Sequence, residues 1–432
     1  MKLSFIGATD DVTGSMTLLE TPTTKILIDC GLYQGISKVI KKNLHPLPFD
    51  PKDLDAIILT HAHLDHSGRI PHLVKRGFRG SIFCTKATMK LARVIMTDSA
   101  HILEKTEHHP LRSFYAMEDV MVATSLFKTK KLHETFSLKD LTIHLFSAGH
   151  ILGAASVHIQ DSEQSIVFSG DIGRSNDPLI SPPESCPQTD LLVMESTYGG
   201  KIRKGDIHEE LISFLKYIKK ESKIGIIASF AVARSQLLIT LIHQFYLEHP
   251  EEKIRFVIDG PMMIEANKIY KEFAEETNLP LALKHALEEV EVIEHVREWE
   301  SIKKKVGPLI IISSSGMISG GRIWRYLENW QDDGNACLFL PGYQAIGTAG
   351  RDLIEGKRII LDEEGKKIHW QGEVHSSSAF SSHADQDELL AWIKNISKDT
   401  TIYLNHGEME SKQKFMDKLK ELGHKKVYMA QP

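Results

Sequence analysis

Residues 61–66 read His61-Ala62-His63-Leu64-Asp65-His66, which places three imidazoles and one carboxylate within six residues. They directly follow LDAIILT (residues 54–60), an apolar run with the length and composition of a buried strand. Side chains that are close together in a loop can point at a common centre, and histidine with aspartate is a ligand set suited to zinc. A lone histidine is more often structural, but four such groups at this spacing predict a metal site at a strand end.

The residues around this stretch indicate further strands and two helices. The N-terminal segments KLSFIGA, SMTLLET and TKILIDCG are short, rich in β-forming residues and separated by turn residues. LTIHLFSAGH, AASVHIQ, SIVFSGD and DLLVMEST, within residues 141–197, are four more strand candidates. Residues 67–78 and 86–105 have the patterns of helices.

The pattern changes after about residue 206, where four strand-like segments are each followed by a helical one. The pairs are 224–230 with 233–248, 254–260 with 262–276, 308–316 with 321–330, and 335–342 with 348–355. Strand-then-helix units in series are typical of a doubly wound parallel sheet. Because residues after about 372 resemble the first part again, we expect residues 206–372 to be an inserted domain, with 1–205 and 373–432 forming the other domain.

The amino-acid composition is that of a folded, globular protein. The 432 residues are 42% hydrophobic and 25% charged, which excludes a disordered or collagen-like chain and fits two domains. The four cysteines include no Cys-x-x-Cys pair, so we expect neither a disulfide framework nor a thiolate zinc site. No apolar run reaches the eighteen or so residues of a spanning helix, and the N-terminal segment lacks the apolar stretch of a signal peptide. We therefore expect a cytoplasmic protein that does not associate with membranes.

The net charge does not favour binding of a polyanion, whereas the histidine content favours a metal site. With 52 Lys and Arg against 57 Asp and Glu, the formal net charge is −5, which does not by itself attract a polyanion. Any nucleic-acid binding must therefore come from local features. The 22 histidines support a metal site, because histidine is the commonest metal ligand and a proton carrier near neutral pH.

The stretch at 61–66 resembles the His-x-His-x-Asp-His signature of the metallo-β-lactamase superfamily. Asp29, His150 and Asp171, in KILIDCG, SAGHILGA and FSGDIGR, match the superfamily's other motifs. The resemblance implies two metal ions, expected to be zinc, with Asp29 orienting the ligand loop. The ligand sets that it implies are His61, His63 and His150 for one ion and Asp65, His66 and His406 for the other, with Asp171 bridging the two.

Three more motifs narrow the resemblance. Glu195-Ser-Thr-Tyr-Gly, Ser-His383-Ala-Asp and Leu-Asn-His406-Gly look like motifs A, B and C of the β-CASP group of nucleic-acid processing nucleases. A doubly wound insertion between motifs A and B is that group's defining feature. The resemblance covers essentially the whole chain and implies an α/β fold, a metallo-β-lactamase αββα sandwich with an inserted doubly wound parallel-sheet β-CASP domain.

The resemblance also implies the substrate. Motif C is histidine in RNA-acting members and valine in DNA-acting ones, so His406 points to RNA. The chain resembles the endonuclease subunit of the cleavage and polyadenylation specificity factor and its prokaryotic relatives. Single-stranded RNA is expected, because a narrow cleft threads a strand more easily than it admits a duplex. We expect phosphodiester hydrolysis, as an endonuclease, a 5′ exonuclease or both, with a hydroxide shared by the metals as the nucleophile.

His383 is the candidate general acid for the departing 3′ oxygen. The resemblance places it beside the metals and hydrogen-bonded to Glu195, and a neighbouring carboxylate keeps an imidazole protonated by raising its pKa. Asp65 and Asp29 complete the expected catalytic set. The alternative is that His383 and Glu195 form a structural pair.

Three turns of the insertion follow apolar strands and open helices, where backbone N–H groups and the helix dipole favour phosphate. They resemble segments that line the family's substrate cleft, although tight turns alone would also explain them. The candidate RNA-binding residues are Phe230, Arg234, Ser315, Gly316, Gly347, Thr348, Gly350 and Arg351.

Two other functions are weighed against ribonuclease. A thioester or lactone hydrolase such as glyoxalase II shares the motif at 61–66 but lacks the insertion and motifs A to C. A non-catalytic subunit of an RNA-processing complex would have lost metal ligands, whereas all seven ligand positions are filled here. The sequence leaves open the RNA preference, a homodimer, the source organism, and manganese or iron in place of zinc.

Overall fold

The computed structural model describes residues 1–35, 37–106, 109–305, 307–361 and 365–432. Its internal contacts divide the chain into two compact units, Met1–Ile202 with Ser382–Pro432, and Arg203–Ser381. Within the described ranges, no helix is both long enough and apolar enough to cross a membrane.

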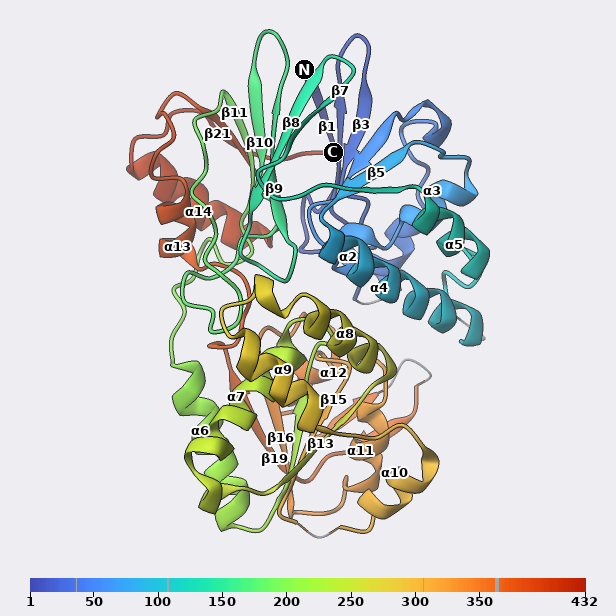
Figure 1. Cartoon of the computed structure of the whole chain (residues 1–432), viewed down its shortest axis with the longest axis vertical. Helices are drawn as coiled ribbons and strands as arrows, with labels where there is room; N and C mark the ends of the chain where they lie inside the picture. Colours follow the sequence, from blue (N-terminus) through green and yellow to red (C-terminus); the bar gives the residue numbers. More distant parts are fainter. Residues whose placement is uncertain (36, 107–108, 306, 362–364) are drawn as a thin grey trace. The chain divides into compact units, whose positions relative to one another are not determined.

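The first unit contains two mixed β-sheets that face each other (Figure 1). One sheet follows chain order, with strands β1 (Lys2–Gly7), β2 (Met16–Glu20), β3 (Lys25–Ile28), β4 (Ala56–Ile58), β5 (Ser81–Cys84) and β6 (Phe127–Thr129). The other has the order β21-β20-β11-β10-β9-β8-β7, with strands β7 (Thr135–Leu138), β8 (Leu141–Ser147), β9 (Ala155–Gln160), β10 (Ser165–Phe168), β11 (Leu191–Glu195), β20 (Thr401–Asn405) and β21 (Val427–Met429).

Helices cover the outer face of each sheet and complete an αββα sandwich. Helices α2 to α5 lie outside the first sheet, and α13 and α14 lie outside the second (Figure 1). The helices are α1 (Ser37–Ile40), α2 (Leu64–Ser67), α3 (Ile70–Lys75), α4 (Lys86–Lys105), α5 (Met117–Ser125), α13 (Gln386–Trp392) and α14 (Met409–Glu421), with 3₁₀ turns η1 (Lys41–Leu44) and η2 (Pro51–Asp53).

Side-chain alternation in the strands produces two apolar cores. In β8, Leu141, Ile143 and Leu145 are buried between the two sheets, whereas His144 points to the other face. On that other face of the second sheet, apolar residues such as Val167 pack against α13 and α14. Both cores lie on the faces of the sheets, and polar residues occupy the strand ends.

The second unit is built on a six-stranded, entirely parallel sheet in the order β14-β13-β15-β12-β16-β19. The strands are β12 (Ile224–Ala228), β13 (Arg255–Asp259), β14 (Glu291–Val292), β15 (Leu309–Ser313), β16 (Ala336–Pro341) and β19 (Glu373–Ser377), with a separate ribbon of β17 (Ile359–Leu361) and β18 (Lys367–His369). The helices are α6 (Ile207–Lys220), α7 (Arg234–Glu248), α8 (Pro261–Glu272), α9 (Pro280–Glu289), α10 (Val296–Ile302), α11 (Ile323–Asn329) and α12 (Ala349–Ile354), with 3₁₀ turns η3 (Pro250–Glu252) and η4 (Ala274–Glu276).

The predicted αββα sandwich and doubly wound sheet are both confirmed, and all four predicted strand-then-helix units are present, as β12–α7, β13–α8, β15–α11 and β16–α12. Two local features differ from the sequence interpretation. Asp65 and His66 lie in the short helix α2 rather than in a loop. Residues 373–377, assigned above to the outer domain, form β19 and pair with β16. The domain boundaries at 205/206 and 372/373 stay predictions, and the contact-based units divide the chain at 202/203 and 381/382 instead.

Candidate metal centre and active site

The predicted metal ligands come from four separate segments of the first unit, and the structure brings all of them together. Each segment follows the end of a strand or opens a helix. His61 and His63 follow β4, Asp65 and His66 lie in α2, His150 follows β8, Asp171 follows β10 and His406 follows β20.

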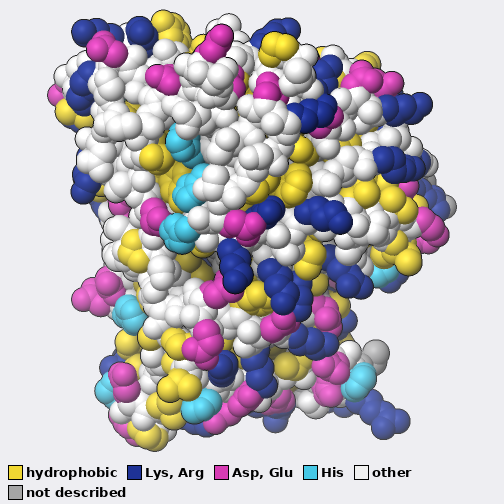
Figure 2. Space-filling model, turned by 45° about the horizontal axis from the view of Figure 1, so that its top comes forward, with side chains coloured by type: hydrophobic (Ala, Val, Ile, Leu, Met, Phe, Trp, Pro, Cys, Tyr) yellow, Lys and Arg dark blue, Asp and Glu magenta, His cyan; other side chains and the backbone are white. Residues whose placement is uncertain are grey.

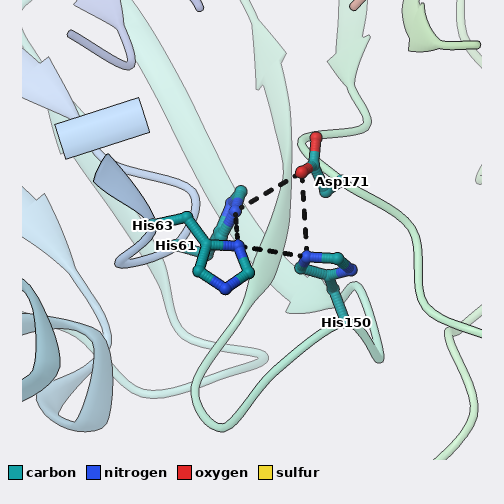
Figure 3. Close-up of side chains that lie close together, drawn as sticks. All are labelled: His61, His63, His150 and Asp171. Atoms are coloured by element: carbon teal, nitrogen blue, oxygen red, sulfur yellow. Dashed lines mark hydrogen bonds and ion pairs between the residues drawn. The ribbon is translucent and has the colours of Figure 1, made fainter. Parts of the chain in front are cut away.

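His61, His63, His150 and Asp171 form the first group (Figure 3), with ligand atoms within 4.8 Å of one another. His63 Nδ1 lies 3.1 Å from His61 Nε2 and 3.3 Å from His150 Nε2. Asp171 Oδ2 lies 3.5 Å from His61 Nε2 and 3.7 Å from His150 Nε2. Three imidazole nitrogens and a carboxylate oxygen therefore point at one centre.

Asp65, His66, His406 and the same Asp171 form the second group. His406 Nε2 lies 3.2 Å from His66 Nε2 and 3.4 Å from Asp65 Oδ2. Asp171 Oδ1 lies 3.3 Å from His66 Nε2 and 3.5 Å from His406 Nδ1. Asp171 thus presents one oxygen to each group.

The electrostatics of these groups fit a divalent metal. Burial lowers the pKa of His63 to about 4 and the pKa values of His61 and His150 well below the usual range, so these rings are neutral and keep their lone pairs. Burial opposes the charge of Asp171, but His406 and His66 outweigh it and hold its pKa well below the usual range. Its buried Oδ1 makes no hydrogen bond with the described residues. Converging nitrogen lone pairs and a shared carboxylate are the donor set of a metal site.

Asp29 orients ligands of both groups. Its Oδ2 accepts a hydrogen bond from His66 Nδ1 at 2.7 Å, which leaves Nε2 facing the centre. Its Oδ1 accepts from the Thr60 N–H at 2.8 Å and from the Thr60 hydroxyl at 3.0 Å, and Thr60 Oγ1 lies 3.1 Å from His61 Nδ1. Gly31 allows the segment after β3 to lie close to the backbone of Asp65, because a Cβ at this position would lie 1.5 Å from the carbonyl oxygen of Asp65.

His406 is held by its backbone and by a threonine. Its N–H donates to the carbonyl of Ala8 at 2.9 Å, and Thr197 Oγ1 lies 3.2 Å from its Nδ1. The same Ala8 carbonyl accepts from Lys412 Nζ at 3.2 Å, and Lys412 also donates to the carbonyl of Thr9 at 2.6 Å. Lys412 is fully buried, and burial lowers its pKa to about 8.

His383 and Glu195 form a pair beside Asp171. His383 Nδ1 lies 3.2 Å from Glu195 Oε1 and 4.0 Å from Asp171 Oδ2. Burial disfavours the charged ring, but Glu195 and Asp171 outweigh it and raise the pKa of His383. Glu195 is fixed by the N–H groups of Ile172 and Thr197, which donate to its two oxygens at 2.7 and 3.2 Å.

Comparison with known proteins agrees with this geometry. Residues 18–189 match the metallo-β-lactamase superfamily domain, 235–353 match the Beta-Casp domain, and 367–430 match the Zn-dependent metallo-hydrolase RNA specificity domain. A ribonuclease of Thermus thermophilus is 32% identical, over 100% of this chain and 98% of its own length. The chain belongs to the β-CASP family of metallo-β-lactamase proteins. The family resemblance found in the sequence is thus confirmed.

Two further relatives and one solved structure are also similar to this β-CASP protein. A probable ribonuclease of Methanocaldococcus jannaschii is 31% identical, over 94% of this chain and 93% of its own. Cleavage and polyadenylation specificity factor 73 of Drosophila melanogaster is 27% identical, over 94% of this chain and 60% of its own. A crystal structure of an Enterococcus faecalis protein of unknown function shares the fold, with a TM-score of 0.55 and 14% identity over 100% and 97% of the two chains.

The predicted RNA-binding residues of this β-CASP protein lie at one edge of the second unit. They follow the carboxyl ends of β12, β15 and β16, which are adjacent strands. The loops contact one another, because Gln344 Nε2 donates to the carbonyl of Gly316 at 2.9 Å and the Gly350 N–H donates to that of Met317 at 3.1 Å. The structure therefore brings the three predicted loops together.

Several of these residues have structural tasks that the sequence does not reveal. Arg234 is buried and donates to the carbonyl of Pro341, and its guanidinium lies 5.7 Å from the centre of the Phe230 ring. Thr348 caps α12 by accepting from the Arg351 N–H. A Cβ on Gly316 would lie 2.7 Å from the backbone nitrogen of Phe230. Contacts of these loops with RNA stay predictions.

Sequence reasoning missed the groups that support the ligands. Thr60 and Thr197 each hydrogen-bond a ring nitrogen of a predicted ligand, and Lys412 fixes the carbonyl that holds His406. The two threonines had a weak signal, since one directly precedes His61 and the other lies in motif A. Lys412 had none, because only the fold places α14 against the loop after β1.

Proposed function

We propose that this β-CASP protein is a metal-dependent ribonuclease that hydrolyses phosphodiester bonds of single-stranded RNA. The observation that carries the proposal is the position of Asp171, which belongs to both ligand groups and also lies with Glu195 and His383. One carboxylate thus connects two candidate metal positions to a candidate proton donor. The ribonucleases among the relatives and the match to an RNA specificity domain support the same chemistry.

The proposed metals are two zinc ions. His61, His63 and His150 would hold one, and Asp65, His66 and His406 the other, with Asp171 shared. When bound, a pair of such ions supplies Lewis acidity to the phosphoryl oxygens and lowers the pKa of a water molecule. The chain's own part is to fix ligand directions through Asp29, Thr60 and Thr197 and to bury the site, which strengthens electrostatic interactions.

His383 is the proposed general acid, with Glu195 as its positioning partner. Glu195 occupies the Nδ1 side of the ring, so Nε2 is the nitrogen that can give a proton to the departing 3′ oxygen. The raised pKa favours the protonated form of His383, which a general acid must have to act. The expected products carry a 5′ phosphate and a 3′ hydroxyl.

RNA would be held locally rather than by a broad basic surface. Lys and Arg side chains are interspersed with Asp and Glu on the face shown in Figure 2, as expected for a chain with net charge −5. We propose that the three loops after β12, β15 and β16 contact the single-stranded RNA. The ring of Phe230, which is 36% exposed, is available to stack on a base. A small-ester hydrolase would not need the matched Beta-Casp and RNA specificity segments.

The test is cleavage of a single-stranded RNA labelled at its 5′ end, with DNA of the same sequence alongside. His383→Ala should keep the metal content of the wild type and lose about 10²- to 10⁴-fold in kcat, the usual contribution of a general acid. His101→Ala, which removes an exposed histidine of α4, is the matched control and should cleave normally.

The products decide the mode of action. A ladder of internal fragments means endonuclease action, and release of a labelled mononucleotide means 5′ exonuclease action. If metal-loaded wild type leaves the RNA intact, or if His383→Ala cleaves it at the wild-type rate, the proposal or the role of His383 is wrong. Preferential cleavage of the DNA would contradict the inference from His406.

A further inference from the structure

A second cluster of possible metal ligands lies in the second unit, far along the chain from the first. Cys337 Sγ, a carboxylate oxygen of Glu373 and a ring nitrogen of His375 lie within 4.8 Å of one another. Cys337 is in β16, and the other two are in the neighbouring edge strand β19. The spacing of cysteines along the sequence gave no sign of such a site, because strand pairing creates it.

The strand register explains the cluster. Cys337 pairs with Glu373, and Phe339 pairs with His375, in a parallel ladder. Since side chains two residues apart in a strand share a face, Cys337, Glu373 and His375 all point to the same side of the sheet. Helix α6 lies on this side, because Phe214 stacks on Phe339 with ring centres 4.9 Å apart. The three donors are therefore fixed by regular backbone rather than by a loop.

We propose that Cys337, Glu373 and His375 form a binding site for a divalent metal of the zinc type, independent of the ligands in the first unit. Thiolate, imidazole and carboxylate are the three donor types that zinc takes in proteins, and three protein donors leave a fourth position for water. Magnesium or calcium would not select a thiolate. Binding requires the thiol proton of Cys337 to leave to solvent as the metal–sulfur bond forms.

A pocket gives the metal access. A hollow of about 500 Å³ beside the cluster is lined by His375, by the aromatic rings of Phe214 and Tyr217, and by the carboxylates Glu209 and Glu210. These two carboxylates favour the entry of a cation. His375, whose imidazole is 39% exposed, is the donor that lines the pocket, whereas Cys337 is buried.

Lys223 is the competitor that the metal must displace. Its Nζ donates to Glu373 Oε1 at 2.6 Å, and the hydroxyl of Tyr217 donates to both oxygens of Glu373 at 2.8 Å. The ammonium group satisfies Glu373 when no cation is bound, and a flexible lysine side chain can move into solvent when one binds. Metal and Lys223 therefore compete for the same carboxylate, which predicts tighter metal binding when the lysine is removed.

Cobalt(II) is the probe for this site in the metal-free, full-length protein. A cysteine thiolate on cobalt gives a charge-transfer band in the near ultraviolet, and the proposed ligands of the first unit, which are nitrogens and oxygens, give none. The wild type should develop the band as cobalt is added. Cys337→Ser should abolish it, and Cys186→Ser, at another buried cysteine, should leave it unchanged.

Two more variants keep the test decisive if Cys337→Ser folds poorly. His375→Ala, at a partly exposed side chain, should weaken cobalt binding by about tenfold or more, since even partners of metal ligands cost 10- to 100-fold when removed. Lys223→Met should tighten binding. Absence of the band from the wild type, or equal cobalt affinity in His375→Ala, would overturn the proposal. Neither result bears on RNA cleavage, so the two proposals fail separately.

Discussion

The two units of this protein place their candidate functional residues at strand ends by different means. The first unit buries charged and imidazole side chains around Asp171 and holds some of them with hydrogen bonds to groups such as Asp29 and Thr60. The second unit gathers the loops after β12, β15 and β16, and backbone carbonyls of these loops accept hydrogen bonds that connect them. A small cation needs converging lone pairs from side chains, whereas an extended phosphate chain can be met by backbone N–H groups. The difference predicts that substitutions in the first unit abolish activity and that those in the second weaken substrate binding.

Asp171→Ala should have the largest effect. It removes the carboxylate shared by both ligand groups, so we expect metal to be lost from both and kcat to fall by roughly a thousandfold or more. Metal analysis of purified protein and single-turnover cleavage of RNA measure the two effects. Asp399→Asn, at an exposed acid, is the control. Retention of two metals with normal turnover would remove the distinction between the two units.

Glu195→Gln should move the pH dependence of cleavage. Glu195 raises the pKa of His383 against the opposing effect of burial, so its neutralisation lets His383 lose its proton at lower pH. Since a general acid must be protonated to act, the alkaline limb of the kcat profile should shift to lower pH, with about a hundredfold lower kcat above neutrality. The KM for RNA should stay nearly constant. An equal loss of kcat at every pH would instead indicate that Glu195 and His383 form a structural pair.

Lys412→Met tests the buried charge behind His406. Burial lowers the pKa of Lys412 from 10.5 to about 8 in the folded protein, so between these pH values the unfolded chain binds more protons. The wild type therefore gains stability relative to the variant as pH rises from 8 to 10.5, by up to about 3 kcal/mol. Urea unfolding of both proteins at pH 7 and pH 10.5 measures this difference. Lys414→Met, on the exposed side of α14, should show no such dependence.

Phe230→Ala should have the smallest effect, and this effect should be on KM. Loss of one stacking ring weakens binding of single-stranded nucleic acid by about 1 to 3 kcal/mol, which is about 5- to 150-fold, with kcat kept. Leu281→Ala, at an exposed apolar residue of α9, is the control. Equal KM values for the two variants would show that the loop after β12 does not contact RNA. A fall in kcat would extend the catalytic apparatus into the second unit.

The sequence predicted most of the first site because its ligands carry strong local patterns. His61 to His66 form one short motif, and His150 and Asp171 each lie at the end of an apolar strand. The helix at Asp65 and His66 was missed because α2 has only one turn, too short for a periodic signal. β19 was missed because Glu373–Ser377 is a polar edge strand without a hydrophobic pattern. Lys412 could not be predicted, since its role depends on contacts between distant parts of the chain.

The return of the chain to the first unit has a consequence for synthesis. Residues 61–66, 150 and 171 are made early, but the candidate acid His383 and the candidate ligand His406 follow the whole of the second unit. His406 reaches its place by donating its N–H to the carbonyl of Ala8, near the other end of the chain. A nascent polypeptide that stops before residue 383 lacks the proposed proton donor and one proposed metal ligand. Cleavage by the proposed mechanism therefore requires that the chain has been synthesised at least as far as His406.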